Sequence, residues 1–330
     1  MRKIVHIGQM KSGTTYIQNS FHQNREELYR QGYLYPGSLF NHQHACYGIC
    51  GSDIPWIRSG REWEQLGSDL VGEINSSGKD VILSAEALSC MNEKGIASFI
   101  EKINGVDKVV ITVRNFHRVI LSAWQQSIKG GGIKSLPEFI HHIGFCRSEN
   151  IGMWKNYSFG DSARIWAKHA PVDIIVANGN QPSSYLLEKF CESCGVGEVS
   201  EPKLDSSQEN KSLKREDAEL LRSLNILNKE MPKESRYEYI RWLLKKGLFP
   251  AASLEEGSKI KIPEGFVKEI SGWAEDEIEK IPKEVEIIGD INGLAKINSD
   301  DVDKEGAGEG FDVDHLSRFN LIAKLIFKNS

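Results

Sequence analysis

Short apolar runs alternate with segments of helical periodicity through residues 1–205 of the 330-residue chain. Runs of this kind are typical of buried strands, and between them apolar residues recur every three or four positions, which predicts helices. The strand candidates are residues 3–7, 80–83, 108–113 and 172–177. This alternation predicts an α/β protein: a three-layer α/β/α fold with a central parallel sheet. Ligands of such sheets bind at the carboxyl ends of the strands, so the loops that follow the strands matter most.

The strand pattern fades after residue 205, and only helices are predicted beyond it. We expect residues 206–297 to form a helical extension of the same domain as the core at 1–205. Residues 298–314 combine seven acidic residues with several glycines, a composition typical of a solvated linker. Residues 315–330 are predicted to form a C-terminal helix, whose apolar face would dock on the body of the protein or on a second subunit. A homodimer is therefore left open.

The composition is that of an ordinary globular protein, with 40% hydrophobic and 26% charged residues. A net charge of −5 gives the chain no overall basic field, which argues against nucleic acid as its main partner. No run of about 18 apolar residues is present, so no membrane span is expected. The apolar run near the N-terminus is interrupted by His6 and is too short for a signal peptide. A cytoplasmic protein is the expectation.

The six cysteines are too sparse for a disulfide framework in a chain of this length. Cys191 and Cys194 form a CxxC pair on a predicted helix. A redox or zinc role is the alternative, but the second pair that a zinc site needs is missing. Reduced thiols in a reducing compartment are favoured.

A glycine-bearing turn, Gly8 to Gly13, connects the first strand to a helix that begins at Thr14. The first N–H groups of a helix lack internal partners, and the helix dipole adds positive potential, so this arrangement predicts an anion site. The hydroxyl groups of Ser12, Thr14 and Thr15 can donate further hydrogen bonds.

The turn differs in one respect from the ATP/GTP-binding loop GxxxxGK[ST]. Gly8 and Gly13 have the glycine spacing of that motif, and Thr15 supplies its terminal hydroxyl residue. The lysine, however, is Lys11, and the position before Thr15 is Thr14. A lysine inside the turn is expected to face the bond beyond a 5′-phosphate rather than a γ-phosphate.

A second anion site is predicted at the end of the strand at 108–113. Arg114 follows this strand on the ligand side, and Ser122 lies eight residues later on the next predicted helix. A guanidinium group with a hydroxyl group is suitable chemistry for a phosphate. Arg118 lies on the same helix face as Ser122 and is a weaker candidate.

These two segments resemble the sulfotransferases that use 3′-phosphoadenosine 5′-phosphosulfate (PAPS), especially their bacterial branch. The string HIGQMKSGTTYIQ at 6–18 is similar to the loop that binds the 5′-phosphosulfate in that family, which has a P-loop-like fold. By this resemblance Lys11 contacts the bridging oxygen, and residues 12–15 (Ser12, Gly13, Thr14, Thr15) cradle the phosphate. Arg114 and Ser122 match the 3′-phosphate motif of the family. The resemblance is specific over residues 3–20 and 108–125 and is weaker elsewhere.

The resemblance implies transfer of a sulfuryl group from PAPS to a hydroxyl or amine of a carbohydrate, glycoconjugate or small molecule. No metal is required in principle, because Lys11 and the helix N-terminus can hold the charge of the leaving group. The catalytic base is left open. Glu86 follows the strand at 80–83, and His44 lies in a loop where bacterial relatives often carry a histidine pair.

Two alternatives come from other functional classes. The first is a P-loop kinase or nucleoside triphosphatase that uses ATP with magnesium; the position of Lys11 and the Arg114–Ser122 pair count against it. The second is a nucleotide-binding module without catalysis, which would act through its C-terminal helices.

Overall fold

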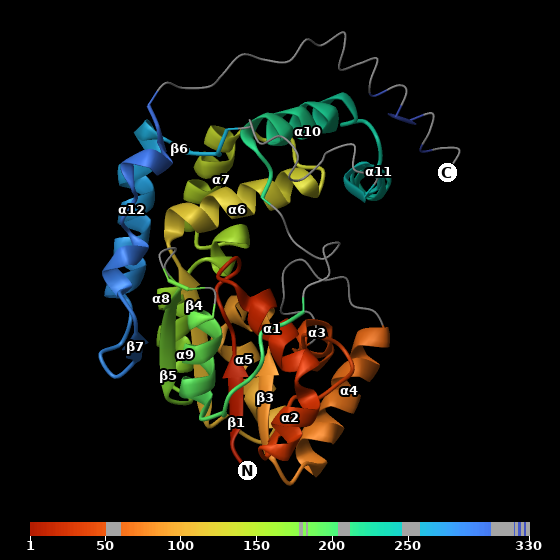
Figure 1. Ribbon diagram of the computed structural model, residues 1–330, viewed down its shortest axis with the longest axis vertical. Coiled ribbons are helices and arrows are strands. Elements are labelled where there is room, and N and C mark those ends of the chain that lie inside the picture. Colours follow the sequence, from red (N-terminus) through yellow and green to blue (C-terminus); the bar gives the residue numbers. More distant parts are fainter. Residues whose placement is uncertain are drawn as a thin grey trace. The chain divides into compact units, whose positions relative to one another are not determined.

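The computed structural model (Figure 1) describes residues 1–50, 61–177, 181–182, 184–203, 212–245 and 258–304, and residues 320, 323, 324 and 327. The predicted linker beyond residue 304 and most of the predicted C-terminal helix lie outside the described residues. The chain divides into two compact units. The first contains residues 1–116, 146–204 and 271–296, and the second contains 117–145, 205–270 and 297–330. The division therefore does not follow a single boundary near residue 205.

The first unit contains a sheet of six parallel strands, which confirms the predicted α/β architecture with a central parallel sheet. The strands stand in the order β2-β3-β1-β4-β5-β7. They are β1 (Lys3–His6), β2 (Tyr33–Leu34), β3 (Asp80–Ser84), β4 (Lys108–Arg114), β5 (Val172–Ala177) and β7 (Glu286–Ile288). From β1 the chain first builds the sheet toward β3 and β2, and then returns to build toward β4 and β5. The switch point of the sheet thus lies beside β1, where ligands of such sheets bind.

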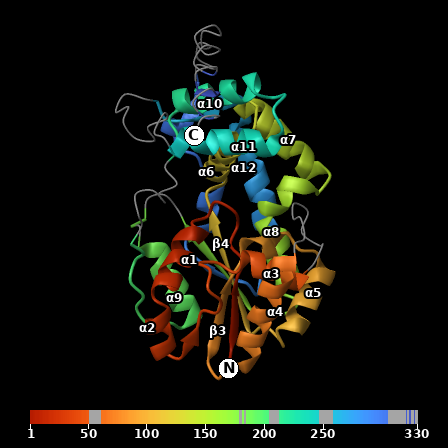
Figure 2. The same cartoon turned by 90° about the vertical axis from the view of Figure 1, so that its right-hand side faces the viewer.

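Helices of the first unit cover both faces of the sheet, as Figure 2 shows. On one side lie α1 (Thr14–Gln23), α2 (Arg25–Arg30) and α9 (Tyr185–Cys194). On the other side lie α3 (Gln43–Cys50), α4 (Arg61–Ser76), α5 (Glu93–Lys102) and α8 (Phe159–Trp166). Short 3-10 helices of this unit lie at Glu86–Cys90, Gly152–Asn156 and Ile291–Leu294. This arrangement is compatible with a three-layer α/β/α fold.

Both faces of the sheet are packed, because β1 is buried along its whole length and β3 and β4 are buried except at their ends. Every residue of β1 is buried, as expected for a strand covered by helices on both sides. On one face, Ile4 and Val110 share a buried cluster with Phe21 of α1 and Phe190 of α9. The rings of Phe21 and Phe190 meet edge to face with centroids 5.2 Å apart.

The second unit is mainly helical where it is described. It contains α10 (Arg215–Leu227) and α11 (Lys233–Lys245), and a small parallel pair of strands, β6 (Ile262–Pro263) with β8 (Val302–Asp303). The helices α6 (Phe116–Lys129), α7 (Leu136–Ser148) and α12 (Glu264–Glu279) have residues in both units. Ser135 and Glu138 form a reciprocal capping box at the start of α7, with the Ser135 N–H donating to Glu138 at 2.7 Å.

Four short strands lie where no strand was predicted. The strand β2 precedes the predicted strand at 80–83, and α3 contains His44, which was predicted to lie in a loop. The strands β6, β7 and β8 lie beyond residue 205, where only helices were predicted. Among the described residues, no helix is long and apolar enough to cross a membrane.

Candidate functional site

The loop after β1 lies along the neighbouring strand β4. The N–H of Ile7 donates to the Val110 carbonyl at 3.0 Å, and the N–H of Gln9 donates to the Thr112 carbonyl at 2.8 Å. On the other side of β1, Ala85 donates its N–H to the His6 carbonyl at 3.0 Å. The carboxyl ends of β3, β1 and β4 therefore hold the loop between them, and the residues that follow each strand gather at one edge of the sheet.

The surroundings of Gly8 and the backbone angles of Lys11 and Gly13 explain why this loop contains glycines and turns tightly. A Cβ atom at Gly8 would overlap the side chains of Thr112 and Thr14, so only glycine fits. Gly13 has a φ of 96° and Lys11 a φ of 70°, both in the left-handed region. Glycine adopts this conformation at no steric cost, but lysine does so at a cost of about 1–2 kcal/mol. Strain of this kind is often found at binding and catalytic sites.

The N-terminus of α1 is open to an anion. Its N-cap residue is Gly13, and no side chain caps the helix. The N–H of Tyr16 donates to the Gly13 carbonyl at 3.0 Å, and the N–H groups before it in the first turn precede the helical hydrogen-bond pattern and carry the positive end of the helix dipole. Thr15 in this first turn is exposed. This end of α1 is thus suited to hold a phosphate or sulfate group.

Lys11, Thr14 and Glu86 lie together beside this helix end. The hydroxyl of Thr14 donates to a carboxylate oxygen of Glu86. Burial raises the pKa of Glu86 to about 7, and the positive charge of Lys11 only partly opposes this shift. Burial also lowers the pKa of Lys11, although Glu86 favours its charged form. A carboxyl group with a pKa near neutrality can accept and release protons at physiological pH, as a general base must.

Arg114 belongs to the same group of charges. Its positive charge lowers the pKa of Lys11, which shows that the two cations are close enough to interact. The backbone N–H of Arg114 donates to Gln9 Oε1 at 3.3 Å, and Gln9 Nε2 donates to the Tyr157 carbonyl at 3.1 Å. Gln9 is buried. It therefore ties the end of β4 to the loop that carries Lys11.

A series of buried hydrogen bonds supports the loop after β1. His6 Nδ1 lies 2.8 Å from Ser84 Oγ, and His6 Nε2 lies 3.1 Å from Thr112 Oγ1. Thr112 Oγ1 in turn lies 2.8 Å from Ser12 Oγ, and Ser12 Oγ donates to the Gln9 carbonyl at 2.6 Å. His6 is fully buried, and burial lowers its pKa to about 3. His6 is therefore neutral at physiological pH.

The Gln9 carbonyl at the end of this series of hydrogen bonds fixes the direction of each bond in the series. A carbonyl only accepts, so the Ser12 hydroxyl donates to Gln9, and Thr112 must then donate to Ser12. His6 consequently donates from Nε2 to Thr112 and accepts at Nδ1 from Ser84. The neutral ring thus carries its proton on Nε2. With its hydrogen given to the Gln9 carbonyl, Ser12 braces the loop in this structure, and its role as a phosphate ligand stays a prediction.

The remaining predicted residues lie on the helices α3, α6 and α9. His44 is exposed on α3 and stacks on the ring of Trp63 from α4, with centroids 5.1 Å apart. Ser122 lies on α6 in the second unit, so its pairing with Arg114 stays a prediction. Cys191 and Cys194 are buried on α9, where burial raises the pKa of Cys191 to about 12 and keeps it a thiol.

Sequence reasoning missed the residues that support the site. His6 and Thr112 lay within predicted strands, Ser84 directly after one and Gln9 in the turn, and none of them was given a supporting role. The available signal was a polar residue within an otherwise apolar strand, because a buried polar group needs a hydrogen-bond partner.

The comparisons with known proteins add no relative. The chain matches no protein-family model, no curated protein and no solved structure.

Proposed function

We propose that the chain is a PAPS-dependent sulfotransferase with a P-loop-like fold. The reaction is in-line transfer of a sulfuryl group to a hydroxyl or amine, with a carbohydrate or glycoconjugate as the favoured acceptor. One observation carries the proposal. A lysine in the left-handed conformation lies beside an uncapped helix N-terminus and a carboxyl group whose pKa is near 7. Together these residues supply positive charge for an anion and an acceptor for a proton.

The donor set fits a phosphosulfate group. Lys11 and the N–H groups at the start of α1 supply positive potential, and the charge of Lys11 favours the deprotonated form of Glu86, whose pKa burial raises to about 7. Lys11 would neutralise the oxygen that is released when the bond between sulfur and the phosphate oxygen breaks. Residues 12–15 would hold the 5′-phosphate, and Arg114 would hold the 3′-phosphate.

Glu86 is the better candidate for the base. Its carboxylate accepts the hydroxyl hydrogen of Thr14, the first residue of α1, and Lys11 acts on its pKa, so it lies beside the proposed anion site. As the acceptor oxygen or nitrogen forms its bond to sulfur, its proton would pass to Glu86. His44 remains the alternative base, and its exposed imidazole stacks on Trp63.

The first experiment is calorimetric titration with adenosine 3′,5′-bisphosphate, the nucleotide left after transfer, in the absence and presence of magnesium. We expect micromolar binding that needs no metal, and reduced binding by Lys11→Ala. Lys94→Ala is the matched control, because Lys94 is exposed on α5. Transfer of label from radioactive PAPS to a panel of carbohydrate acceptors then tests catalysis.

The outcomes separate the functional classes. Magnesium-dependent binding of ATP, with no binding of the bisphosphate, would replace the sulfotransferase with a kinase or triphosphatase. Tight binding of the bisphosphate with no transfer to any acceptor would favour a nucleotide-binding module.

A further inference from the structure

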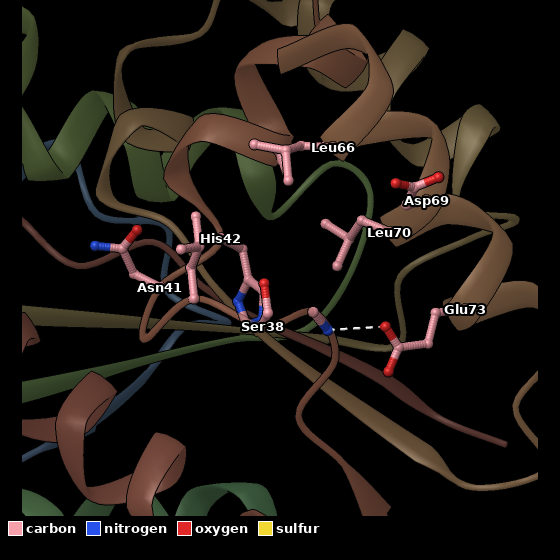
Figure 3. A pocket seen from close by; sticks show the side chains of 10 residues that line it. Ser38, Asn41, His42, Leu66, Asp69, Leu70 and Glu73 are labelled. Carbon is pink, nitrogen blue, oxygen red and sulfur yellow. Dashed lines mark hydrogen bonds between the residues drawn. The ribbon is translucent and has the colours of Figure 1, made fainter. Parts of the chain in front are cut away.

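A cavity of about 380 Å³ lies in the first unit, away from the loop of Lys11. Its walls come from the turn at residues 37–42 and from the helices α3 and α4. In Figure 3, Leu66 and Leu70 point from α4 toward the turn, and Asp69 and Glu73 come from the same helix. The volume falls in the range of about 300–1,000 Å³ that small-molecule sites occupy.

The walls of the cavity are held in place before any ligand binds. His42 accepts the Ser84 N–H at Nδ1 and donates from Nε2 to the Pro36 carbonyl, both at 2.8 Å. The backbone N–H of Gly37 donates to Glu73 Oε2 at 2.8 Å, which ties the turn to α4. A ligand therefore enters a preformed site and pays little for ordering it.

The cavity combines an apolar surface with negative charge. Ala45, Leu66 and Leu70 supply apolar contacts, while Asp69 and Glu73 place two carboxylates one helical turn apart. The residues that line it include no lysine and no arginine. His42 is neutral at physiological pH, because burial lowers its pKa to about 4.

Arg25 lines a neighbouring cavity that shares Gly37 and Glu73 with this one, and its charge interacts with Glu73. Its guanidinium group also donates to the carbonyls of Tyr35 and Leu39, at 3.0 and 2.6 Å, and so braces the turn. Asp69 accepts a hydrogen bond from Gln65 Nε2 at 2.7 Å, a neutral partner that leaves the charge of Asp69 in place. Arg25 thus offsets part of the charge of Glu73, and Asp69 remains a second carboxylate beside the apolar surface.

We propose that this cavity binds a small organic cation, in which an ammonium group is attached to an apolar body. The ammonium would lie beside Asp69 and Glu73, and the apolar body would cover Leu66 and Leu70. This inference is independent of the proposed transfer reaction, because it uses none of the residues assigned to that reaction.

The test is nuclear magnetic resonance of the full chain with labelled leucine methyl groups, titrated with 2-phenylethylamine at pH 7 and low salt. We expect the methyl signals of Leu66 and Leu70 to shift, while Leu224 in the second unit stays unchanged. Two matched compounds keep the phenylethyl body and replace the ammonium with a neutral or a negative head group. The neutral 2-phenylethanol should bind roughly fivefold more weakly, and 3-phenylpropanoate more weakly still.

Substitution of each carboxylate tests whether Asp69 and Glu73 bind the ammonium group. Asp69→Asn and Glu73→Gln preserve shape, and each should weaken binding of the amine by about threefold, with no change for the alcohol. Glu64→Gln is the matched control on the same helix, since Glu64 is exposed and does not line the cavity. Equal affinity for amine and alcohol would overturn the proposal, as would signals that shift only outside this cavity or not at all.

Discussion

The hydroxyl of Thr14 donates a hydrogen bond to the carboxyl group of Glu86. This contact joins the first residue of α1 to Glu86, which follows β3 and Ala85. The helix end that would bind an anion therefore also holds the group that would take a proton. Burial raises the pKa of this carboxyl group to about 7, which places its titration in the physiological range. The consequence is a measurable dependence on pH.

Glu86→Gln should remove the base while keeping an acceptor for Thr14. We expect kcat to fall by about 10²–10⁴-fold, with little change in the affinity for adenosine 3′,5′-bisphosphate. In the unchanged protein kcat should rise with pH through about 7, because Glu86 acts only when deprotonated. The pH profile of labelled sulfate transfer measures this, and His44→Gln is the control. If His44→Gln abolishes the pH dependence and Glu86→Gln does not, His44 is the base.

The same shift predicts a change in stability. The folded pKa of Glu86 is above its ordinary value of 4.5, so its stabilising effect is complete below pH 4.5 and is lost as the pH rises through about 7. Glu86→Gln should therefore leave stability nearly unchanged at pH 4 and raise it by about 1–3 kcal/mol at pH 8. Urea denaturation at the two pH values measures the difference. An equal effect at both would show that the carboxyl group is not perturbed by burial.

Lys11 combines a charge with a strained backbone, and two variants separate these effects. Lys11→Ala keeps the left-handed strain and should lower kcat by about 10²–10³-fold, because the contact with the leaving group counts most in the transition state. Lys11→Gly should lose activity equally but be about 1 kcal/mol more stable than Lys11→Ala, since glycine relieves the strain at a φ of 70°.

Activity and thermal unfolding of the two variants are measured side by side. A fall in donor affinity with unchanged kcat would make Lys11 a binding residue only. Equal stability of the two variants would show that the left-handed conformation at this position carries no strain.

Sequence patterns were sufficient to predict the four central strands of the sheet. Val172–Ala177 was predicted with the boundaries that β5 has, because its apolar residues, interrupted only by Asp173, are typical of a buried parallel strand. The strand β7 escaped prediction, since it has only three residues and pairs with β5 alone at the edge of the sheet. The predicted helix that begins at Thr14 ends at Gln23, and α2 follows it after Asn24, a break that the sequence pattern did not reveal.

The site shows where sequence reasoning reaches its limit. The turn with Lys11 and the position of Glu86 after a strand could be predicted, because both follow from local order along the chain. The hydrogen bonds of His6 could not, since they depend on the register that places Ser84 opposite His6 and on the approach of β4. Long-range pairing of this kind is absent from local patterns.

Arg114 should serve the 3′-phosphate of the donor. Arg114→Ala is expected to weaken binding of adenosine 3′,5′-bisphosphate by about tenfold or more, as a lost charged hydrogen bond does. Binding of adenosine 5′-phosphate, which lacks the 3′-phosphate, should change much less. Calorimetric titration of both nucleotides against both proteins gives the comparison. Equal losses for the two nucleotides would assign Arg114 to the 5′ side instead.

The buried chain through His6 should govern stability in acid. The pKa of folded His6 is about 3, below its ordinary value of 6.5, so its contribution is complete above pH 6.5 and is lost as the pH falls toward 3. Thr112→Val leaves His6 Nε2 without its acceptor and should cost about 1–3 kcal/mol at pH 7. Nitrogen-15 spectra of labelled histidine should show the neutral Nε2–H form of His6 at pH 5, where exposed His44 serves as the reference. A protonated His6 at pH 5 would contradict the inferred directions of the buried hydrogen bonds. The series through His6 could then not support the loop in the way described.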